Sequence, residues 1–178
     1  MRSQLIETPV FIGGHAYREI MTAFPTGVAV VTSTGLDGRP VGLTVNSLMS
    51  VSAEPPILAV SIAGDSRSLA GILESRAFCV NFMGEQSEDI CRHFASHVDE
   101  KFESVSWART RGGVPVLLEG IAAVAECTVV GEYEIGDHVV VAGLVRAGVT
   151  PVEDVAPLIY ARREFRRLAG RARTLAAV

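Results

Sequence analysis

The most constraining feature of the sequence is a pair of long apolar stretches joined by a tight turn. Gly120–Tyr133 and His138–Thr150 are rich in β-branched and small apolar residues, and Glu134-Ile-Gly-Asp137 separates them. Two extended stretches with a short, glycine-containing connection are typical of a β-hairpin. The sequence therefore predicts a protein built on antiparallel strands rather than on alternating strand–helix units.

Other β-patterned and helical segments extend this pattern over most of the chain. Further strands are expected at Gly27–Thr34, Pro40–Val51, Pro55–Ile62 and Ala77–Met83. Short helices are expected at His15–Ala23, around Leu69, Ile72 and Leu73, and at Gln86–Val98. Many strands with only short helices favour a mainly β fold, an antiparallel barrel. With 178 residues, one domain is expected over 15–170, after a mobile arm at 1–14 and before a tail at 171–178.

The apolar content bears on how the domain is assembled. Hydrophobic residues make up 48% of the chain, and its mean hydropathy is +0.32. No apolar run approaches the ~18 residues that a membrane span needs, since Val139–Val145 has only the length of a strand. The excess apolar surface is therefore assigned to a subunit interface, which predicts a homodimer that does not associate with a membrane.

Charge and cysteines limit the partners and the compartment. The formal net charge is −4, although six arginines gather in Arg162–Arg173. A terminal cluster in an acidic chain is expected to be a solvated face, so nucleic acid is not expected as a partner. Cys79, Cys91 and Cys127 form no CxxC pair, and the N-terminal residues show no signal-peptide pattern. These features predict a cytoplasmic protein with reduced cysteines.

The segment Gly42–Ser68 carries the first indication of a ligand. Small and polar residues occupy Gly42–Ser47, in a region that otherwise favours apolar side chains. The strand that ends at Ile62 then leads through a turn to a helix start, where Ser66–Ser68 supply two hydroxyls and an arginine. Unpaired N–H groups at a helix N-terminus, hydroxyls and a guanidinium all suit phosphate. The segment is compatible with a phosphorylated ligand, and a plain serine helix cap explains the same residues.

Several familiar catalytic motifs are incomplete or absent. Gly64–Ser68 resembles the nucleophile elbow GxSxG, but its last position is serine instead of glycine. His93 and His97 share a helical face with Asp89, yet Phe94 replaces the glutamate of HExxH, and a surface helix face explains the spacing. We therefore expect no metal. Neither GxGxxG nor GxxxxGK[ST] occurs, so a dinucleotide would bind outside Rossmann and P-loop sites.

Six short segments in a fixed order give the sequence a family resemblance. They are FPTGVAVVTS (Phe24–Ser33), GLTVNSLMSVSAEPPILAVSI (Gly42–Ile62), SRSLAGILESRAFCVNF (Ser66–Phe82), EKF (Glu100–Phe102), GDH (Gly136–His138) and PLIYARREF (Pro157–Phe165). Together they resemble the short-chain flavin reductases, the reductase partners of two-component flavin-dependent monooxygenases. The resemblance covers Tyr17 to Leu168, which is nearly the whole chain.

This resemblance implies a fold and an activity. The fold would be the split antiparallel β-barrel, dimeric, with the flavin near the interface. The activity would be that of an NAD(P)H:flavin oxidoreductase, which reduces FMN or FAD with NADH or NADPH and supplies reduced flavin to a monooxygenase. Because the cofactors carry the chemistry, no acid–base triad is expected. The alternative is a non-catalytic flavin carrier or store in the same barrel; the GDH and PLIY segments disfavour a third reading, an oxidase of the pyridoxamine-phosphate type.

The resemblance also assigns site residues. The flavin ring and its polar edge would be lined by Gly42, Leu43, Thr44, Asn46 and Ser47. The ribityl chain and phosphate would be held by Ser61, Ile62, Ala63, Ser66, Arg67 and Ser68. Further flavin-side positions would be Asn81, Phe94, Lys101 and Phe102. The nicotinamide coenzyme would lie by Asp137, by His138 as the catalytic residue, and by Tyr160 and Arg162.

Two segments depart from the family pattern. Many relatives read Y-H-R-G where this chain reads Tyr160-Ala-Arg-Arg163, which alters the expected coenzyme geometry and leaves a 2′-phosphate contact by Arg163 open. Asp65 precedes the serine–arginine turn where relatives often place a lysine, so Arg67 would carry more of the charge compensation. From the residues alone, Gly136-Asp-His138 is ordinary turn chemistry, and the role of His138 depends on the resemblance.

Overall fold

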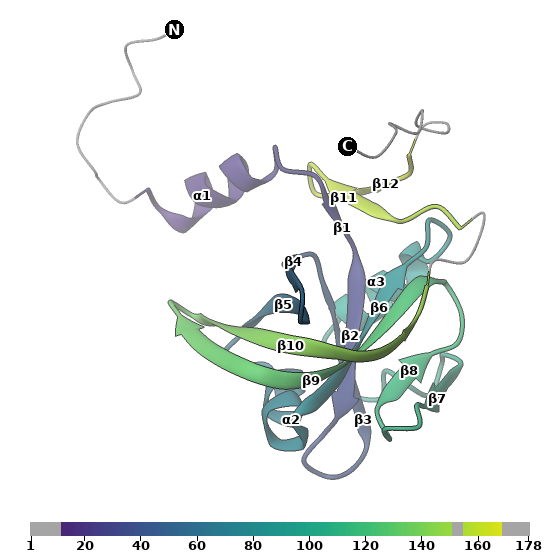
Figure 1. The fold of residues 1–178 in the computed structure, drawn as a ribbon. Coiled ribbons are helices and arrows are strands. Elements are labelled where there is room, and N and C mark those ends of the chain that lie inside the picture. The colour runs from purple at the N-terminus through teal and green to yellow at the C-terminus, as the bar shows by residue number, and fades with distance from the viewer. Residues whose placement is uncertain (1–11, 151–154, 169–178) are drawn as a thin grey trace, which may run out of the picture.

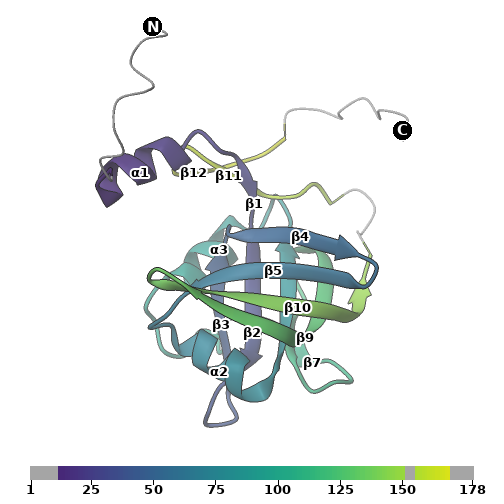
Figure 2. The same ribbon diagram turned by 60° about the vertical axis from the view of Figure 1, so that its left-hand side comes forward.

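The computed structural model describes residues 12–150 and 155–168, and these form a mainly β protein. Its largest element is a seven-stranded antiparallel sheet with the strand order β3-β2-β6-β9-β10-β5-β4. The strands are β2 (Ala29–Thr34), β3 (Pro40–Val45), β4 (Leu48–Ala53), β5 (Pro56–Ala63), β6 (Ala77–Met83), β9 (Ile121–Ile135) and β10 (His138–Val149). The sheet curls around a core (Figure 1, Figure 2), which confirms the predicted antiparallel barrel.

The predicted strands are present, but several of their ends shift. Gly27 belongs to β1 (Thr26–Gly27), whereas β2 begins at Ala29, and the hairpin connection predicted at Glu134–Asp137 shortens to Gly136 and Asp137. The hairpin of β9 and β10 is confirmed, with Ile135 opposite His138. The single strand predicted at Pro40–Val51 is wrong: the chain turns at Asn46 and Ser47, so that β3 pairs with β2 whereas β4 pairs with β5. The two turn residues are exposed, and apolar residues resume directly after them. The sequence pattern therefore continues through the corner without a break.

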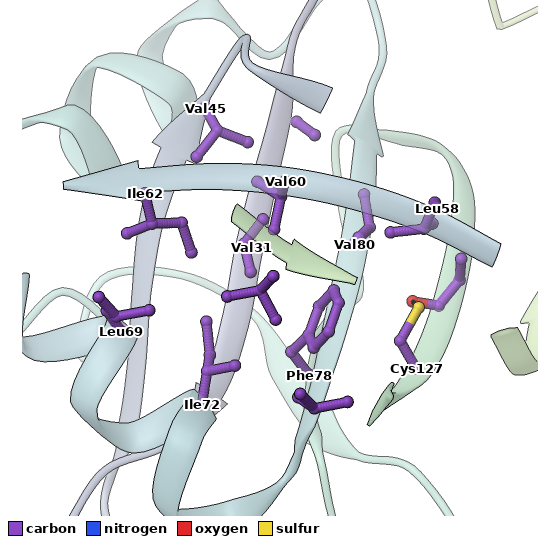
Figure 3. Close-up of a cluster of buried hydrophobic side chains, with 14 residues drawn as sticks. Val31, Val45, Leu58, Val60, Ile62, Leu69, Ile72, Phe78, Val80 and Cys127 are labelled. Atoms are coloured by element: carbon purple, nitrogen blue, oxygen red, sulfur yellow. Dashed lines mark hydrogen bonds between the residues drawn. The ribbon is translucent and has the colours of Figure 1, made fainter. Parts of the chain in front are cut away.

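The core of the barrel is formed by strands on opposite sides and by one helix (Figure 3). Val31, Val60 and Phe78 are fully buried and belong to one apolar cluster. Leu69 and Ile72 of α2 (Arg67–Ser75) enter the same cluster, so this helix closes one end of the barrel. The predicted apolar face of that helix is thereby confirmed.

A second apolar cluster packs α3 (Glu88–Ala95) against the sheet. The ring of Phe94 lies edge-on to Phe102 with centroids 5.2 Å apart, and Phe102 lies edge-on to Trp107 at 5.5 Å. Trp107 belongs to a small ribbon of β7 (Trp107–Arg109) and β8 (Pro115–Leu117). The helix predicted at Gln86–Val98 is shorter, because Ser96 is already extended. The aromatic rings hold the segment that follows α3 beside β3.

The two ends of the described chain meet away from the barrel (Figure 1, Figure 2). There, α1 (Gly14–Met21) precedes a small sheet of β1 (Thr26–Gly27), β11 (Ile159–Ala161) and β12 (Glu164–Arg166). No residue of α1 is buried. Strands of two or three residues are too short to show an alternating pattern, so the sequence predicts neither this small sheet nor the β7–β8 ribbon.

Some predictions concern the chain ends, the cysteines and the membrane. Residues 1–11 of the predicted arm, and the tail at 171–178, lie outside the described residues. Cys79, Cys91 and Cys127 are free and buried, and burial raises the pKa of each thiol to about 12, so they pack as small apolar side chains. In the described ranges, no helix is both long and apolar enough to cross a bilayer.

Candidate functional site

A large groove of about 980 Å³ runs along β3 between α2 and the segment that follows α3. Ten of the predicted site residues line it: Gly42, Leu43, Thr44, Ala63, Ser66, Arg67, Ser68, Phe94, Lys101 and Phe102. These residues come from five different parts of the chain. The fold therefore brings together most of the positions that the sequence assigned to a flavin.

Close packing shapes the floor of the large groove. A Cβ atom at Gly42 would lie 2.9 Å from Phe94 Cε1, so only glycine allows the ring to approach β3 this closely. Thr44 faces the same helix, and its hydroxyl donates to the Cys91 carbonyl at 2.7 Å. β3 and α3 therefore form one rigid wall of the groove.

The N-terminus of α2 opens into the groove with its donors uncommitted. Ser66 occupies the N-cap position, but its hydroxyl makes no capping hydrogen bond. The amide N–H groups of the first helical turn have no intrahelical acceptor. Next to them, Ser68 is buried whereas Arg67 is exposed. This donor set fits a phosphate group, because an anion satisfies the orphan N–H groups and the positive end of the helix dipole.

Ion pairs and one buried amine flank this donor set. Arg67 Nη1 lies 2.7 Å from Asp99 Oδ1, and both side chains are more than 70% exposed. Lys101 Nζ donates to the carbonyl of Phe94 at 2.8 Å and to that of Gly42 at 3.3 Å. Burial lowers the pKa of Lys101, and the charge of Arg67 lowers it further. The charged side chains around the groove are nevertheless mostly acidic: Arg39, Arg67 and Lys101 face Asp37, Asp65, Asp99, Glu100 and Glu103.

A smaller pocket of about 440 Å³ adjoins the large groove. The two share Thr44, Ala95 and Ser96 as lining residues. The other residues that line the small pocket are Val28, Val45, Asn46, Arg92, Tyr160, Arg163 and Phe165. Two predicted residues, Asn46 and Tyr160, are among them. The shared lining residues make the two hollows neighbours, so that ligands in both would meet over Thr44.

Aromatic and cationic side chains give the small pocket its character. Tyr160 and Phe165 pack edge-on with ring centroids 5.5 Å apart, and the Arg92 guanidinium lies 5.1 Å from the Phe165 ring centroid. The sequence assigned no role to Arg92 or Phe165. No local signal marks either residue, because the Arg92 guanidinium meets the Phe165 ring only through tertiary packing.

Four predicted flavin residues lie outside both hollows. Asn81 is fully buried: its amide donates to the Val30 carbonyl and the Thr32 hydroxyl, and its oxygen accepts from the Leu117 N–H. Ile62 belongs to the barrel core. The other two residues, Ser47 and Ser61, join the β3–β4 corner to β5 through a 2.6 Å hydrogen bond from the Ser47 hydroxyl to the Ser61 carbonyl.

The GDH segment lies at the exposed tip of the β9–β10 hairpin. His138 Nδ1 is 2.7 Å from Asp137 Oδ1, and this hydrogen bond is the main reason that the pKa of Asp137 is lowered. His138 pairs with Ala63, a lining residue of the large groove, and the Gly64 N–H donates to the Asp137 carbonyl. His138 itself lines neither hollow, and it belongs to a different sheet from Tyr160.

The remaining predicted residue, Arg162, also stays outside. Its side chain is exposed, and its N–H donates to the Thr22 carbonyl. The neighbouring Arg163 lines the small pocket instead.

Metal-ligating side chains do not gather in the described part of the chain, where no group of three of them occurs. His93 Nε2 is hydrogen-bonded to the Lys101 carbonyl at 2.8 Å.

Comparison with known proteins relates this geometry to an activity. A family profile described as "Flavin reductase like domain" matches residues 21–169. The chain is 43% identical over 160 residues to a flavin reductase (NADH) of Kitasatospora aureofaciens, covering 89% of this chain and 84% of that protein. It is 32% identical over 149 residues to the reductase subunit of a flavin-dependent monooxygenase from Rhodococcus jostii, covering 84% and 75%.

A solved structure is similar over nearly the same length. The NADH:FAD oxidoreductase of Streptomyces globisporus, in complex with NAD and FAD fragments, superposes with a TM-score of 0.80. The two sequences are 33% identical, and the match covers 88% of this chain and 93% of that one. Fold and sequence thus point to the same group of proteins.

Proposed function

Because this chain belongs to the flavin reductase like domain family, we propose that it is an NAD(P)H:flavin oxidoreductase, which reduces FMN or FAD and supplies the reduced flavin to a partner monooxygenase. The observation that carries the proposal is the pair of adjoining hollows. One contains the uncapped start of α2, whose free N–H groups suit a phosphate, and the other is lined by arginines and aromatic rings. Two neighbouring sites suit an enzyme that brings two cofactors face to face.

Each hollow has its own task in this proposal. The α2 start and Arg67 would bind the flavin phosphate, while Gly42–Thr44 of β3 would support the ring. The small pocket would receive the pyridine nucleotide against Tyr160. Asn46, predicted on the flavin side, lines this pocket instead. When both are bound, the nicotinamide supplies a hydride that the flavin ring accepts. The protein contributes alignment of the two rings over Thr44 and exclusion of water, a task that requires no acid–base triad.

One assay tests the proposed activity. Purified protein is mixed with NADH or NADPH and with riboflavin, FMN or FAD in excess, and coenzyme oxidation is followed at 340 nm. Rapid turnover of free flavin is expected. Tight flavin binding without turnover would instead identify a non-catalytic flavin carrier.

Replacing Arg67 by alanine is expected to weaken FMN binding roughly 10-fold, the lower end for a charge-assisted hydrogen bond. The loss is expected at the lower end of that range, because the Arg67 side chain is exposed to solvent and forms an ion pair with Asp99. Riboflavin has no phosphate, so its affinity should not change. Fluorescence titration gives both dissociation constants. Arg111→Ala serves as the control, since this exposed arginine lines neither hollow. Equal losses for FMN and riboflavin would contradict a phosphate contact.

We also propose that the protein is a homodimer in the cytoplasm. Among the described residues, α1 buries no side chain: Tyr17 and Ile20 in this helix, and Phe24 shortly after it, expose apolar surface. The edge strand β4 exposes Met49 and Val51 in the same way. A second copy covering these surfaces would remove them from water. The three reduced, dispersed cysteines support the cytoplasmic location.

Light scattering at micromolar concentration is expected to give about twice the 18.9 kDa of one chain. The variant Met49→Lys places a charge on the exposed edge and should shift the protein toward monomer. A monomeric wild type, with and without flavin, would contradict the proposal.

A further inference from the structure

The turn between β11 and β12 has a conformation that its residues disfavour. Ala161 pairs with Glu164, so Arg162 and Arg163 alone form the turn. Both have positive φ, 53° and 64°. Two-residue turns of this kind favour glycine and asparagine, because an L side chain in the left-handed region crowds its own backbone. Such a conformation in a non-glycine residue is a reason to look for a function.

Of the two arginines in this turn, only Arg163 lines a pocket of the site. Arg162 is exposed and lines neither hollow. Arg163 lines the small pocket, and its Nη2 donates to Glu19 Oε1 at 2.5 Å. A guanidinium has five N–H donors, so most of them stay available beside that bond. The ion pair thus holds the side chain of Arg163 in place while leaving it able to bind another anion.

The small pocket differs from the large groove in charge, because carboxylates do not outnumber basic side chains among the described residues that line it. Among the described residues that line it, Arg92 and Arg163 are the charged ones. Arg92 is held over Phe165 and is paired with Glu88, which does not line the pocket. In the large groove, by contrast, five carboxylates face three basic side chains, and the whole chain carries −4. A pocket lined by two guanidinium groups and no carboxylate favours an anionic ligand.

We infer that Arg163, together with Arg92, binds a phosphate group of the pyridine nucleotide, and that the strained turn is kept because it places Arg163 at the pocket. This inference rests on the proposed function. A pyridine nucleotide offers two sources of that phosphate. The pyrophosphate is present in both coenzymes, whereas the 2′-phosphate is present only in NADPH. The required chemistry is the same, so the two coenzymes can be compared directly.

The test uses Arg163→Gly, with Arg76→Gly as a matched control. Arg76 also has a positive φ (56°) and pairs with one glutamate, Glu132 at 2.5 Å, but it lines neither hollow. Glycine relieves the backbone in both variants, so each should fold with a Tm within about 4 °C of wild type. Calorimetric titration with NAD⁺ and NADP⁺, and steady-state kinetics with NADH and NADPH, are then compared.

Arg163→Gly is expected to raise Kd and KM for the coenzyme roughly 5- to 10-fold with kcat unchanged, while Arg76→Gly changes neither. A loss confined to NADP⁺ and NADPH identifies the 2′-phosphate, and an equal loss for both coenzymes identifies the pyrophosphate. Unchanged Kd and KM in Arg163→Gly, or the same loss in Arg76→Gly, would overturn the inference. A loss seen in Arg162→Gly instead would overturn the choice of Arg163. Failure of the proposed function looks different, because the wild type itself would then not oxidise either coenzyme.

Discussion

Replacing Phe94 by alanine is expected to destabilise the protein by about 3–5 kcal/mol, the range for removing a fully buried aromatic ring. Phe94 has no exposed surface, and its ring contacts Phe102, His93 and the backbone of β3 at Gly42. At this chain length, each kcal/mol lowers Tm by about 2–4 °C, so a drop of roughly 10 °C should be seen by calorimetry. Because Phe94 also lines the large groove, flavin affinity should fall as well.

A double variant shows whether the loss arises at the contact with Gly42. Gly42→Ala alone should destabilise by about 1–3 kcal/mol, because its methyl would lie 2.9 Å from the Phe94 ring. In the Phe94→Ala background the methyl no longer meets the ring, and only the Val31 carbonyl oxygen, 3.2 Å away, stays close to it. The double variant should therefore be less destabilised than the sum of the two. Unfolding is measured at equal protomer concentration, since the proposed dimer would dissociate as it unfolds. Strict additivity would contradict the contact.

Replacing His138 by alanine is expected to lower the rate of hydride transfer on the order of 100-fold, the loss that ~1 Å of misplacement can cause. His138 lies at a hairpin tip with a half-exposed side chain, so the fold and the flavin affinity should stay close to wild type. It lies beside Ala63, which lines the large groove, and is held by Asp137. Stopped-flow measurement of flavin reduction at limiting coenzyme gives the rate.

The pH profile separates two roles for this imidazole. Positioning predicts that His138→Ala lowers the rate by the same factor at every pH, whereas proton donation predicts a loss that changes with pH. Asp137→Asn is the matched variant, because it keeps the imidazole but replaces the carboxylate that holds it. We expect a smaller loss in that variant. A reduction rate equal to wild type in His138→Ala would make His138 a turn residue only.

The sequence alone predicts the elements that have long periodic patterns. The β9–β10 hairpin, β2, β5 and β6 lie where alternation and β-branched residues place them, and Leu69 and Ile72 of α2 face the core as expected. Local patterns report whether a side chain is buried, which is why they find such elements. They do not report the partner of a strand, and the corner at Asn46–Ser47 was therefore invisible as a boundary between β3 and β4.

The candidate site divides in the same way. The donor set at Ser66–Ser68 can be predicted from sequence, because the helix start, its hydroxyls and its arginine belong to one local segment. Such a segment suits a phosphate. Asn81 is equally visible in the sequence as a polar residue in an apolar strand. Only the tertiary structure shows that its amide donates to β2 and that its oxygen accepts from β8. Similarly, Arg162 and Arg163 are neighbours in sequence, and the backbone of one turn directs only the second to the small pocket.

The sequence by itself therefore determined which residue types were present, which of the longer segments became extended, and where a helix start carries donors that suit a phosphate. The tertiary structure decided which of these groups face a common space. It did so because Thr44 of β3, Ser96 after α3 and Tyr160 of β11 are remote in sequence and become neighbours only through strand pairing and burial of the core. Hydrophobic burial selects the overall arrangement, and it acts on the whole chain at once rather than on any local stretch.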